Sequence, residues 1–152
     1  MIIKDYTLFH KIVPSQGKIM GLDIGTKRIG VAICDETRFL TTPKVIIARQ
    51  SDMKDFAKIV DLIKENAIKA IVVGFPINMN GSLNEMSEFS RKFIIKLDGF
   101  LVGKLPIFPA DERLTSFEAD QYAKEISSRK GQKNHDDIAA SVILQDFLEM
   151  VK

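Results

Sequence analysis

The chain has 152 residues, of which 45% are hydrophobic, and this length suits one domain with a single core. Its 22 basic and 20 acidic side chains leave a net charge of +2, so overall charge does not mark a nucleic-acid binder, and any affinity for phosphate must come from local patches. The single cysteine, Cys34, excludes an internal disulfide and favours a reducing, cytoplasmic location.

Residues 1–17 match nothing later in the sequence and are predicted to form an N-terminal extension that adds an edge strand. They contain no apolar run of the signal-peptide kind. No segment reaches the roughly 18–20 consecutive apolar residues that a membrane-spanning helix needs, so no membrane contact is expected.

Residues 18–152 are predicted to form one α/β domain, with a mixed central sheet and helices packed on it. Apolar patterning and turn residues predict strands at 19–24, 29–34, 45–48, 70–73 and 105–109. Helical spacing and helix-start signals predict helices at 52–66, 82–97, 115–126 and 134–150, with a polar, basic loop at 127–133. Asp52 is the expected cap of the first helix, and capping-box patterns at 82–85 and 115–118 start the next two.

Asp23 lies in the middle of the first predicted core strand. Because burying an unpaired carboxylate costs roughly several kcal/mol, an acid in this position needs a partner. A bound cation could offset that cost, which suggests a metal ligand, and a hydrogen-bonded structural Asp is the alternative.

The segment 25–30, Gly-Thr-Lys-Arg-Ile-Gly, follows that strand at once. Glycines allow a backbone to approach phosphate closely, and Lys27 and Arg28 add positive charge. An ordinary hairpin turn with two solvated basic residues explains the pattern equally well.

Two further acidic segments lie at the ends of predicted elements. Asp111, Glu112 and Arg113 follow a proline-containing strand, where they suit metal and phosphate, although a solvated loop would also explain them. Asp136 and Asp137 open the last helix, where acids ordinarily complement the helix dipole. Helical spacing places Asp136 nearer the middle of the stripe that should face the sheet. Three acids from distant segments could together hold two hard cations that activate water for phosphodiester hydrolysis.

Four segments together resemble the YqgF (RuvX) family. They occur in family order and read MGLDIGTKRIGVA at 20–32, VGFPINMNG at 73–81, DERLT at 111–115, and DDIAA at 136–140 followed by ILQ at 143–145. Each motif alone is weak, but the four jointly are specific. The resemblance extends from about residue 18 to the end of the sequence and leaves residues 1–17 outside.

The resemblance implies an RNase H-like fold and a metal-dependent nuclease. Members are described as nucleases that process the 5′ end of pre-16S ribosomal RNA in ribosome biogenesis, and also as Holliday junction resolvases. Carried over by position, the catalytic and metal-ligating acids are Asp23, Glu112 and Asp136, with Asp111 a weaker candidate for the second place. The expected cofactor is Mg²⁺ or Mn²⁺.

A nucleic-acid substrate is expected to contact several polar and basic side chains, namely Thr26, Lys27, Arg28, Asn78, Arg113 and Lys133. Asn80 stands where the second motif usually has Asp, so any contact made by that acid would be altered in this chain. RNA and branched DNA remain alternatives because no base-reading motif is present. Symmetric junction cutting would need a homodimer, and the sequence leaves monomer and homodimer both open.

Two other classes of function remain open. The Asp-x-Gly-Thr run followed by a hairpin also resembles the start of actin-like and sugar-kinase folds, but those proteins close two such domains over ATP, and 152 residues cannot supply both. A non-catalytic RNA- or ribosome-binding module would suit the modest charge and Asn80. A module of this kind would bind nucleic acid without forming any Mn²⁺-dependent product.

Overall fold

The computed structural model describes residues 1–112 and 136–152, and within helix α5 it leaves the side chains of Asp136 and Asp137 undescribed. The helix predicted at 115–126, the loop predicted at 127–133, and the predicted substrate contacts Arg113 and Lys133 therefore lie outside the described residues.

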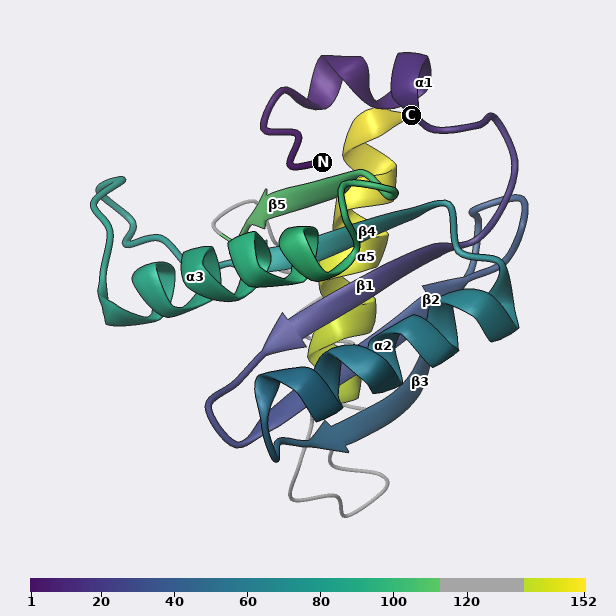
Figure 1. Cartoon of the computed structure of the whole chain (residues 1–152). Helices are drawn as coiled ribbons and strands as arrows, with labels where there is room; N and C mark the ends of the chain where they lie inside the picture. Colours follow the sequence, from purple (N-terminus) through teal and green to yellow (C-terminus); the bar gives the residue numbers. More distant parts are fainter. Residues whose placement is uncertain (113–135) are drawn as a thin grey trace, which may run out of the picture.

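Five strands form one mixed sheet in the order β3-β2-β1-β4-β5 (Figure 1). Their bounds are β1 (Ile19–Ile24), β2 (Arg28–Cys34), β3 (Thr41–Ala48), β4 (Ala70–Phe75) and β5 (Ile107–Asp111). The pairs β1–β2 and β2–β3 are antiparallel, whereas β1–β4 and β4–β5 are parallel. The carboxyl ends of β1, β4 and β5 therefore meet at one edge of the sheet, where parallel strands usually present a site.

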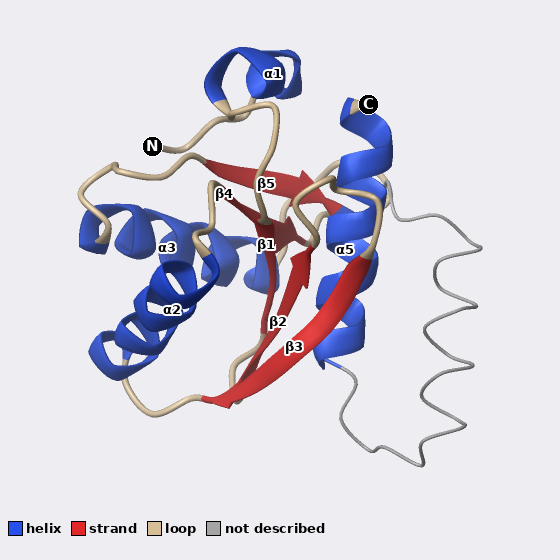
Figure 2. Ribbon diagram, turned by 90° about the vertical axis from the view of Figure 1, so that its right-hand side faces the viewer, coloured by secondary structure: helices blue, strands red, loops and turns tan. Residues whose placement is uncertain are grey.

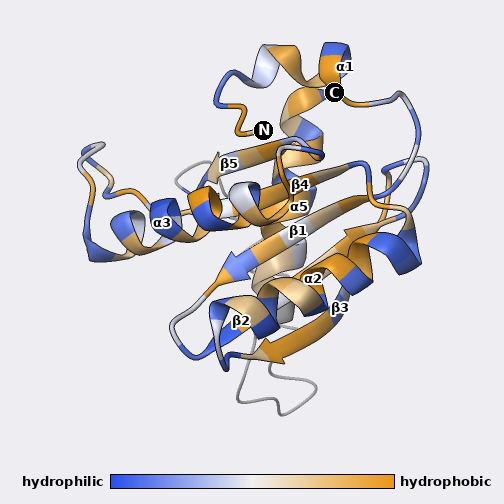
Figure 3. Cartoon of the chain, viewed as in Figure 1, coloured by the Kyte–Doolittle hydropathy of each residue, from blue (hydrophilic) through white to orange (hydrophobic). Residues whose placement is uncertain are grey.

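Helices cover both faces of this sheet (Figure 2). Helices α2 (Asp52–Asn66) and α3 (Glu85–Phe100) pack on one face, and α5 (Asp136–Val151) crosses the other. Strand alternation divides the core accordingly, because Leu22 and Val73 belong to the cluster on the α2 and α3 side, whereas Val72 and Phe108 pack with α5. In Figure 3 the strands are coloured mostly as hydrophobic, whereas hydrophobic and hydrophilic residues alternate along α2 and α3.

The predicted elements agree with most of the described structure. The bounds of β1 and the end of α2 at Asn66 are confirmed, β3 begins earlier at Thr41, and β4 continues through Gly74 to Phe75. The strand predicted at 105–109 lies instead at Ile107–Asp111, so both of its predicted ends were two residues early.

The predicted helix caps were wrong by one or two residues. Ser51, not Asp52, caps α2, because its side chain accepts a hydrogen bond from the backbone nitrogen of Lys54. Helix α3 is capped by Asn84 rather than Ser82, and its capping box joins Asn84 to Ser87. The capping-box pattern predicted at 82–85 is present in the sequence, but Asn84 and Ser87 form the capping hydrogen bonds instead.

Residues 1–17 contain η1 (Tyr6–Leu8) and α1 (Phe9–Ile12) and pack against the α5 side of the sheet. In place of the predicted edge strand, only Ile2 forms an isolated parallel bridge with Ile107. Phe9 is buried, and its ring lies 5.3 Å from that of Phe108. The sequence did not predict this burial.

Among the described helices, none combines the length and the apolar character needed to cross a membrane.

Candidate active site

Asp23 lies near the carboxyl end of β1, opposite Gly30 of β2, and is partly buried. Its neighbours Leu22 and Ile24 belong to the core on the α2 and α3 side, so alternation directs Asp23 to the α5 face. Gly21, on the same face, confirms this direction, because a Cβ at Gly21 would stand 2.8 Å from the Cβ of Leu144 in α5.

Glu112 follows β5 directly and folds back over β4. A Cβ built on Gly74 would stand 2.6 Å from Glu112 Oε1 and 2.7 Å from Ile143 Cδ1, so the carboxylate lies on the α5 face. Leu22 pairs with Val73, which makes Asp23 and Gly74 the next residues along these two parallel strands. The carboxylates of Asp23 and Glu112 therefore share one face and one edge of the sheet.

Burial raises the pKa of Glu112 above its ordinary value, and the charge of neighbouring Asp111 raises it further. The Glu112 carboxylate is costly to ionise because it is partly desolvated and lies near the charge of Asp111. A bound divalent cation would reverse that penalty. Carboxylate oxygens are the ligands that Mg²⁺ and Mn²⁺ prefer. The chemistry of the described pair therefore fits the expected metal.

Asp111 is directed away from this pair. It is the register partner of Phe75, whose side chain packs with the core on the α2 and α3 side. Asp111 borders a pocket of about 750 Å³ on that side, which Lys4 also lines. It borders the smaller Glu112 pocket as well, but strand alternation sends its side chain to the opposite face. The geometry thus favours Glu112 over Asp111 as the second acid.

Asp136 is the first residue of α5. It lies one helical turn before Ala140, whose carbonyl oxygen would stand 3.0 Å from a Cβ on Gly21, so α5 begins over the face that carries Asp23. Within the described part of the chain, no three His, Cys, Asp or Glu side chains form a group that could hold a metal ion. The predicted third ligand belongs to the side chains outside that description.

The turn between β1 and β2 carries three of the predicted substrate contacts. Its backbone is closed by a hydrogen bond of 2.8 Å from the nitrogen of Gly25 to the carbonyl oxygen of Arg28. Thr26 and Lys27 are exposed, and Arg28 is partly buried. The turn begins two residues after Asp23, so its donors lie at the same end of β1 as the acid.

Asn78 and Asn80 support the loop between β4 and α3. The amide of Asn78 donates to Ser82 Oγ at 2.9 Å, and its Oδ1 accepts from Asn84 Nδ2 at 2.9 Å. Asn80 Oδ1 accepts from the backbone nitrogen of Ser82 at 3.0 Å. A carboxylate could accept the same bond, so the replacement of the usual Asp by Asn80 keeps this turn intact.

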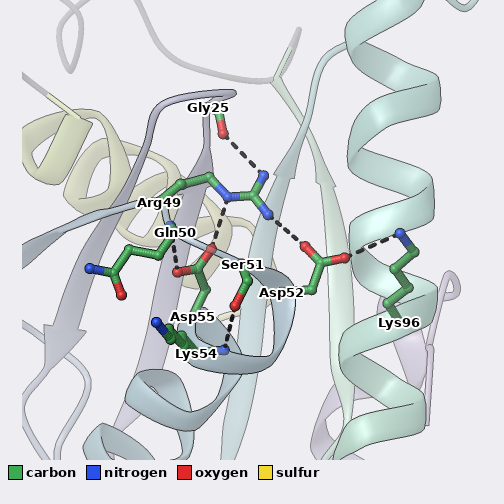
Figure 4. Close-up of polar contacts among 8 residues, drawn as sticks. All are labelled: Gly25, Arg49, Gln50, Ser51, Asp52, Lys54, Asp55 and Lys96. Atoms are coloured by element: carbon green, nitrogen blue, oxygen red, sulfur yellow. Dashed lines mark hydrogen bonds and ion pairs between the residues drawn. The ribbon is translucent and has the colours of Figure 1, made fainter.

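Two residues that the sequence did not single out support the site. Gly74 leaves the space that the Glu112 carboxylate fills. Arg49 joins the β1–β2 turn to the start of α2 (Figure 4). For Arg49 the available signal was a basic residue between a strand and a helix, with acids three and six positions later. For Gly74 it was a glycine within an apolar strand pattern, which often marks a close approach.

Known proteins resemble this chain in both sequence and fold. A family model described as "RuvX: Holliday junction resolvase" matches residues 17–150. A protein of Roseiflexus sp. (strain RS-1), named "Putative pre-16S rRNA nuclease", is 36% identical over 88% of this chain and 94% of its own length. A relative of the same name from Ehrlichia chaffeensis is 32% identical over 100% of this chain and 97% of its own length.

Solved structures show the fold. RuvC from T. thermophilus in complex with a Holliday junction substrate superposes with a TM-score of 0.57 at 12% identity, covering 85% of this chain and 91% of that one. The yeast mitochondrial Holliday junction resolvase Ydc2 gives a TM-score of 0.55 at 10% identity, over 95% of this chain and 82% of that one. These likenesses confirm the predicted RNase H-like fold. With the sequence matches, they establish that the chain belongs to the RuvX family.

Proposed function

We propose that this protein is a metal-dependent nuclease that hydrolyses nucleic-acid phosphodiesters. The observation that carries the proposal is the placement of the Glu112 carboxylate over Gly74, on the same sheet face as Asp23. Two acids from distant segments, one of them partly desolvated, form the kind of oxygen-rich site that hard cations need.

Each part of the site has a distinct role in this proposal. Asp23 and Glu112 hold the metal, and Asp136, at the start of α5, completes the ligand set. Mg²⁺ or Mn²⁺, when bound, supplies an activated water and neutralises the charge on the leaving oxygen. Lys27 and Arg28 bind the phosphates beside the reacting bond and orient it toward the acids, and Thr26 adds a hydroxyl donor. Arg113 and Lys133, which lie outside the described residues, are proposed as further phosphate contacts because of their charge.

For the substrate, we propose the 5′ region of pre-16S ribosomal RNA, which would place the protein in the cytoplasm. The support is that relatives named for this activity align over nearly their whole length, 94% and 97% in the two cases above. Resolution of Holliday junctions is the second candidate, because the family description and the structural relatives carry that name.

One cleavage experiment separates these alternatives. Labelled pre-16S RNA and labelled four-way DNA junctions are incubated with the protein in Mn²⁺ or in EDTA. We expect the RNA to be cut in Mn²⁺ and neither substrate to be cut in EDTA. A cut junction with intact RNA would favour the resolvase, and tight binding without any product would favour a non-catalytic module.

The same assay with Asp23→Asn tests the site itself. We expect this variant to fold and to lose cleavage, because the amide can no longer serve as an anionic ligand. Asp61→Asn is the matched control, because Asp61 is exposed on α2, on the opposite side of the sheet. Cleavage by Asp23→Asn at the wild-type rate would refute the assigned role.

A further inference from the structure

Arg49 occupies the short connection between β3 and α2, and its side chain is only 13% exposed. Its guanidinium Nε donates to Asp55 Oδ2 at 3.2 Å, and its Nη2 donates to Asp52 Oδ1 at 2.9 Å (Figure 4). The side chain of Asp55 is fully buried. Both acids belong to the first turn of α2, so Arg49 is bound to that helix by two ion pairs.

Helix α3 meets the same group from the other side. The guanidinium carbon of Arg49 lies 5.5 Å from the ring centre of Phe89 and 5.3 Å from that of Phe93. Lys96 Nζ donates to the second oxygen of Asp52 at 3.2 Å. Two acids therefore neutralise Arg49 while two rings cover it, and the planar guanidinium is held in one orientation.

The third guanidinium nitrogen of Arg49, Nη1, is directed at the β1–β2 turn. Its Nη1 donates to the carbonyl oxygen of Gly25 at 3.4 Å, as Figure 4 shows. Its backbone nitrogen donates to the carbonyl oxygen of Lys27 at 2.9 Å. The turn is thus bound at its first residue by the side chain and near its last by the main chain. Both bonds come from a residue that α2 and α3 hold in place.

We propose that Arg49 is a positioning residue for the phosphate-binding turn at residues 25–28. It fixes the direction in which Lys27 and Arg28 present their donors beside Asp23, and it does not contact the substrate itself. This inference rests on the proposed function of the turn. Burial and pairing with two acids leave Arg49 unsuited to binding phosphate, whereas its fork reaches three acceptors that one ammonium group cannot reach together.

Two variants test the inference while keeping the fold. Arg49→Lys retains the charge but loses the forked geometry. The double variant Arg49→Met with Asp55→Asn removes both ion pairs of Arg49 without leaving Asp55 as a buried, unpaired carboxylate, which would itself destabilise the protein. Arg91→Lys is the matched control, because Arg91 is an exposed arginine on α3 that pairs with Glu88. Thermal unfolding identifies any variant that no longer folds.

The first measurement is hydrogen exchange of the backbone amide of Gly25, whose hydrogen bond to the carbonyl oxygen of Arg28 closes the turn. We expect faster exchange in both Arg49 variants than in the wild type, with unchanged exchange in the central residues of β1. Unchanged exchange in the turn would overturn the inference, because the turn would then hold its shape without Arg49. This readout needs neither substrate nor cleavage, so its outcome does not depend on the proposed function.

The second measurement is the Kd for the labelled RNA in EDTA at several salt concentrations. We expect both variants to bind about tenfold more weakly, a change of about 1.4 kcal/mol, with the same slope of log Kd against log salt. Lys27→Ala should lower that slope by about 0.7–0.9, because a phosphate contact is lost. An equal drop in the Arg49 variants would mean direct phosphate contact and would overturn the inference.

The third measurement is the single-turnover cleavage rate at saturating protein. We expect a smaller change in this rate than in Kd, because the carboxylates remain in place while the turn loses its fixed orientation. A wild-type protein that cuts RNA, together with Arg49 variants of unchanged Kd, would refute the positioning role and leave the nuclease proposal standing. A wild-type protein that cuts nothing would refute the nuclease proposal alone.

Discussion

The carboxylate of Glu112 fills the space that a side chain on Gly74 would need. A Cβ on that glycine would stand 2.6 Å from Glu112 Oε1, well inside van der Waals contact. The same Cβ would stand 2.7 Å from Ile143 Cδ1 of helix α5, so α5 leaves no room for a side chain at position 74 either. The absence of a side chain at position 74 is therefore what lets an acid from the end of β5 lie over the sheet beside Asp23.

Gly74→Ala should displace the Glu112 carboxylate. We expect the variant to fold with a loss of about 1–3 kcal/mol in the free energy of unfolding, because the new methyl group overpacks a filled site. Its cleavage rate should fall by about tenfold or more, because the displaced carboxylate no longer holds the metal in the productive geometry. Urea unfolding and the Mn²⁺-dependent cleavage assay measure the two effects.

Gly99→Ala is the matched control for that substitution. Gly99 lies in α3, and apart from its chain neighbours and the adjacent backbone of its own helix nothing stands within 4 Å of the position that its Cβ would take. Alanine should stabilise this helix by up to about 1 kcal/mol and leave cleavage unchanged. If Gly74→Ala also cut at the wild-type rate, the placement of Glu112 would not matter for the reaction.

Glu112→Gln and Asp111→Asn together identify the second acid. Because Glu112 shares the face of Asp23 and Asp111 is directed to the opposite face, we expect Glu112→Gln to lose cleavage by about a hundredfold or more. Asp111→Asn should retain activity within a few fold, since it changes only a neighbouring charge. Cleavage rates at fixed Mn²⁺ decide the point, and the reverse pattern would assign the role to Asp111.

The pKa of Glu112 also predicts how stability depends on pH in the metal-free protein. Burial raises the pKa of this carboxyl in the folded state above its ordinary value of 4.5, so the folded protein favours the protonated acid. The stabilising effect of the protonated Glu112 carboxyl is complete below its pKa in the unfolded chain. It is lost as pH rises through its pKa in the folded protein. Ionised Glu112 therefore destabilises the metal-free protein at neutral pH.

Glu112→Gln should consequently raise the Tm in EDTA at neutral pH, and the gain should vanish at about pH 4 and below. Added Mn²⁺ should stabilise the wild type more than the variant, because the metal binds the folded state through the carboxylate. Glu65→Gln, an exposed substitution on α2, is the control and should show neither effect. A Tm difference that is independent of pH would contradict the assignment of the shift to Glu112.

Local patterning was sufficient for the elements whose own residues determine them. Apolar patterning predicted β1, and helical spacing predicted α2 and its observed end at Asn66. The choice between Asp111 and Glu112 could not be made in this way, because it depends on the register of β4 with β5. A shift of one residue exchanges the two faces of a strand, so the neighbouring strand has to be known first.

Long-range contacts account for most of what the sequence did not predict. Phe9, in the extension, is buried against Phe108 and Phe147 from the far end of the chain. Arg49 has a defined role only because α2, α3 and the β1–β2 turn meet at its side chain. Such contacts carry no periodic signal, whereas the four short motifs identified the family because their residues are read in order along the chain.

The N-terminal extension forms hydrogen bonds with backbone groups along the outer edge of β5. The backbone nitrogen of Ile3 donates to the carbonyl oxygen of Ile107 at 2.8 Å. The hydroxyl of Tyr6 donates to the carbonyl oxygen of Pro109 at 2.5 Å and accepts from the backbone nitrogen of Asp111 at 3.3 Å. Since β5 is the last strand of the sheet, these groups would otherwise be free to pair with another chain.

Tyr6→Phe should therefore weaken both the fold and its protection against association. Loss of the hydroxyl leaves two partly buried backbone groups of β5 without this partner, which should lower the free energy of unfolding by about 1–3 kcal/mol. We also expect light scattering to increase at high protein concentration, because the edge strand can recruit a second copy. Thr7→Val is the control, since the Thr7 hydroxyl bonds to Asp5 on the exposed surface, away from the strand. If Tyr6→Phe matched that control in both stability and scattering, the extension would not protect the edge through this side chain.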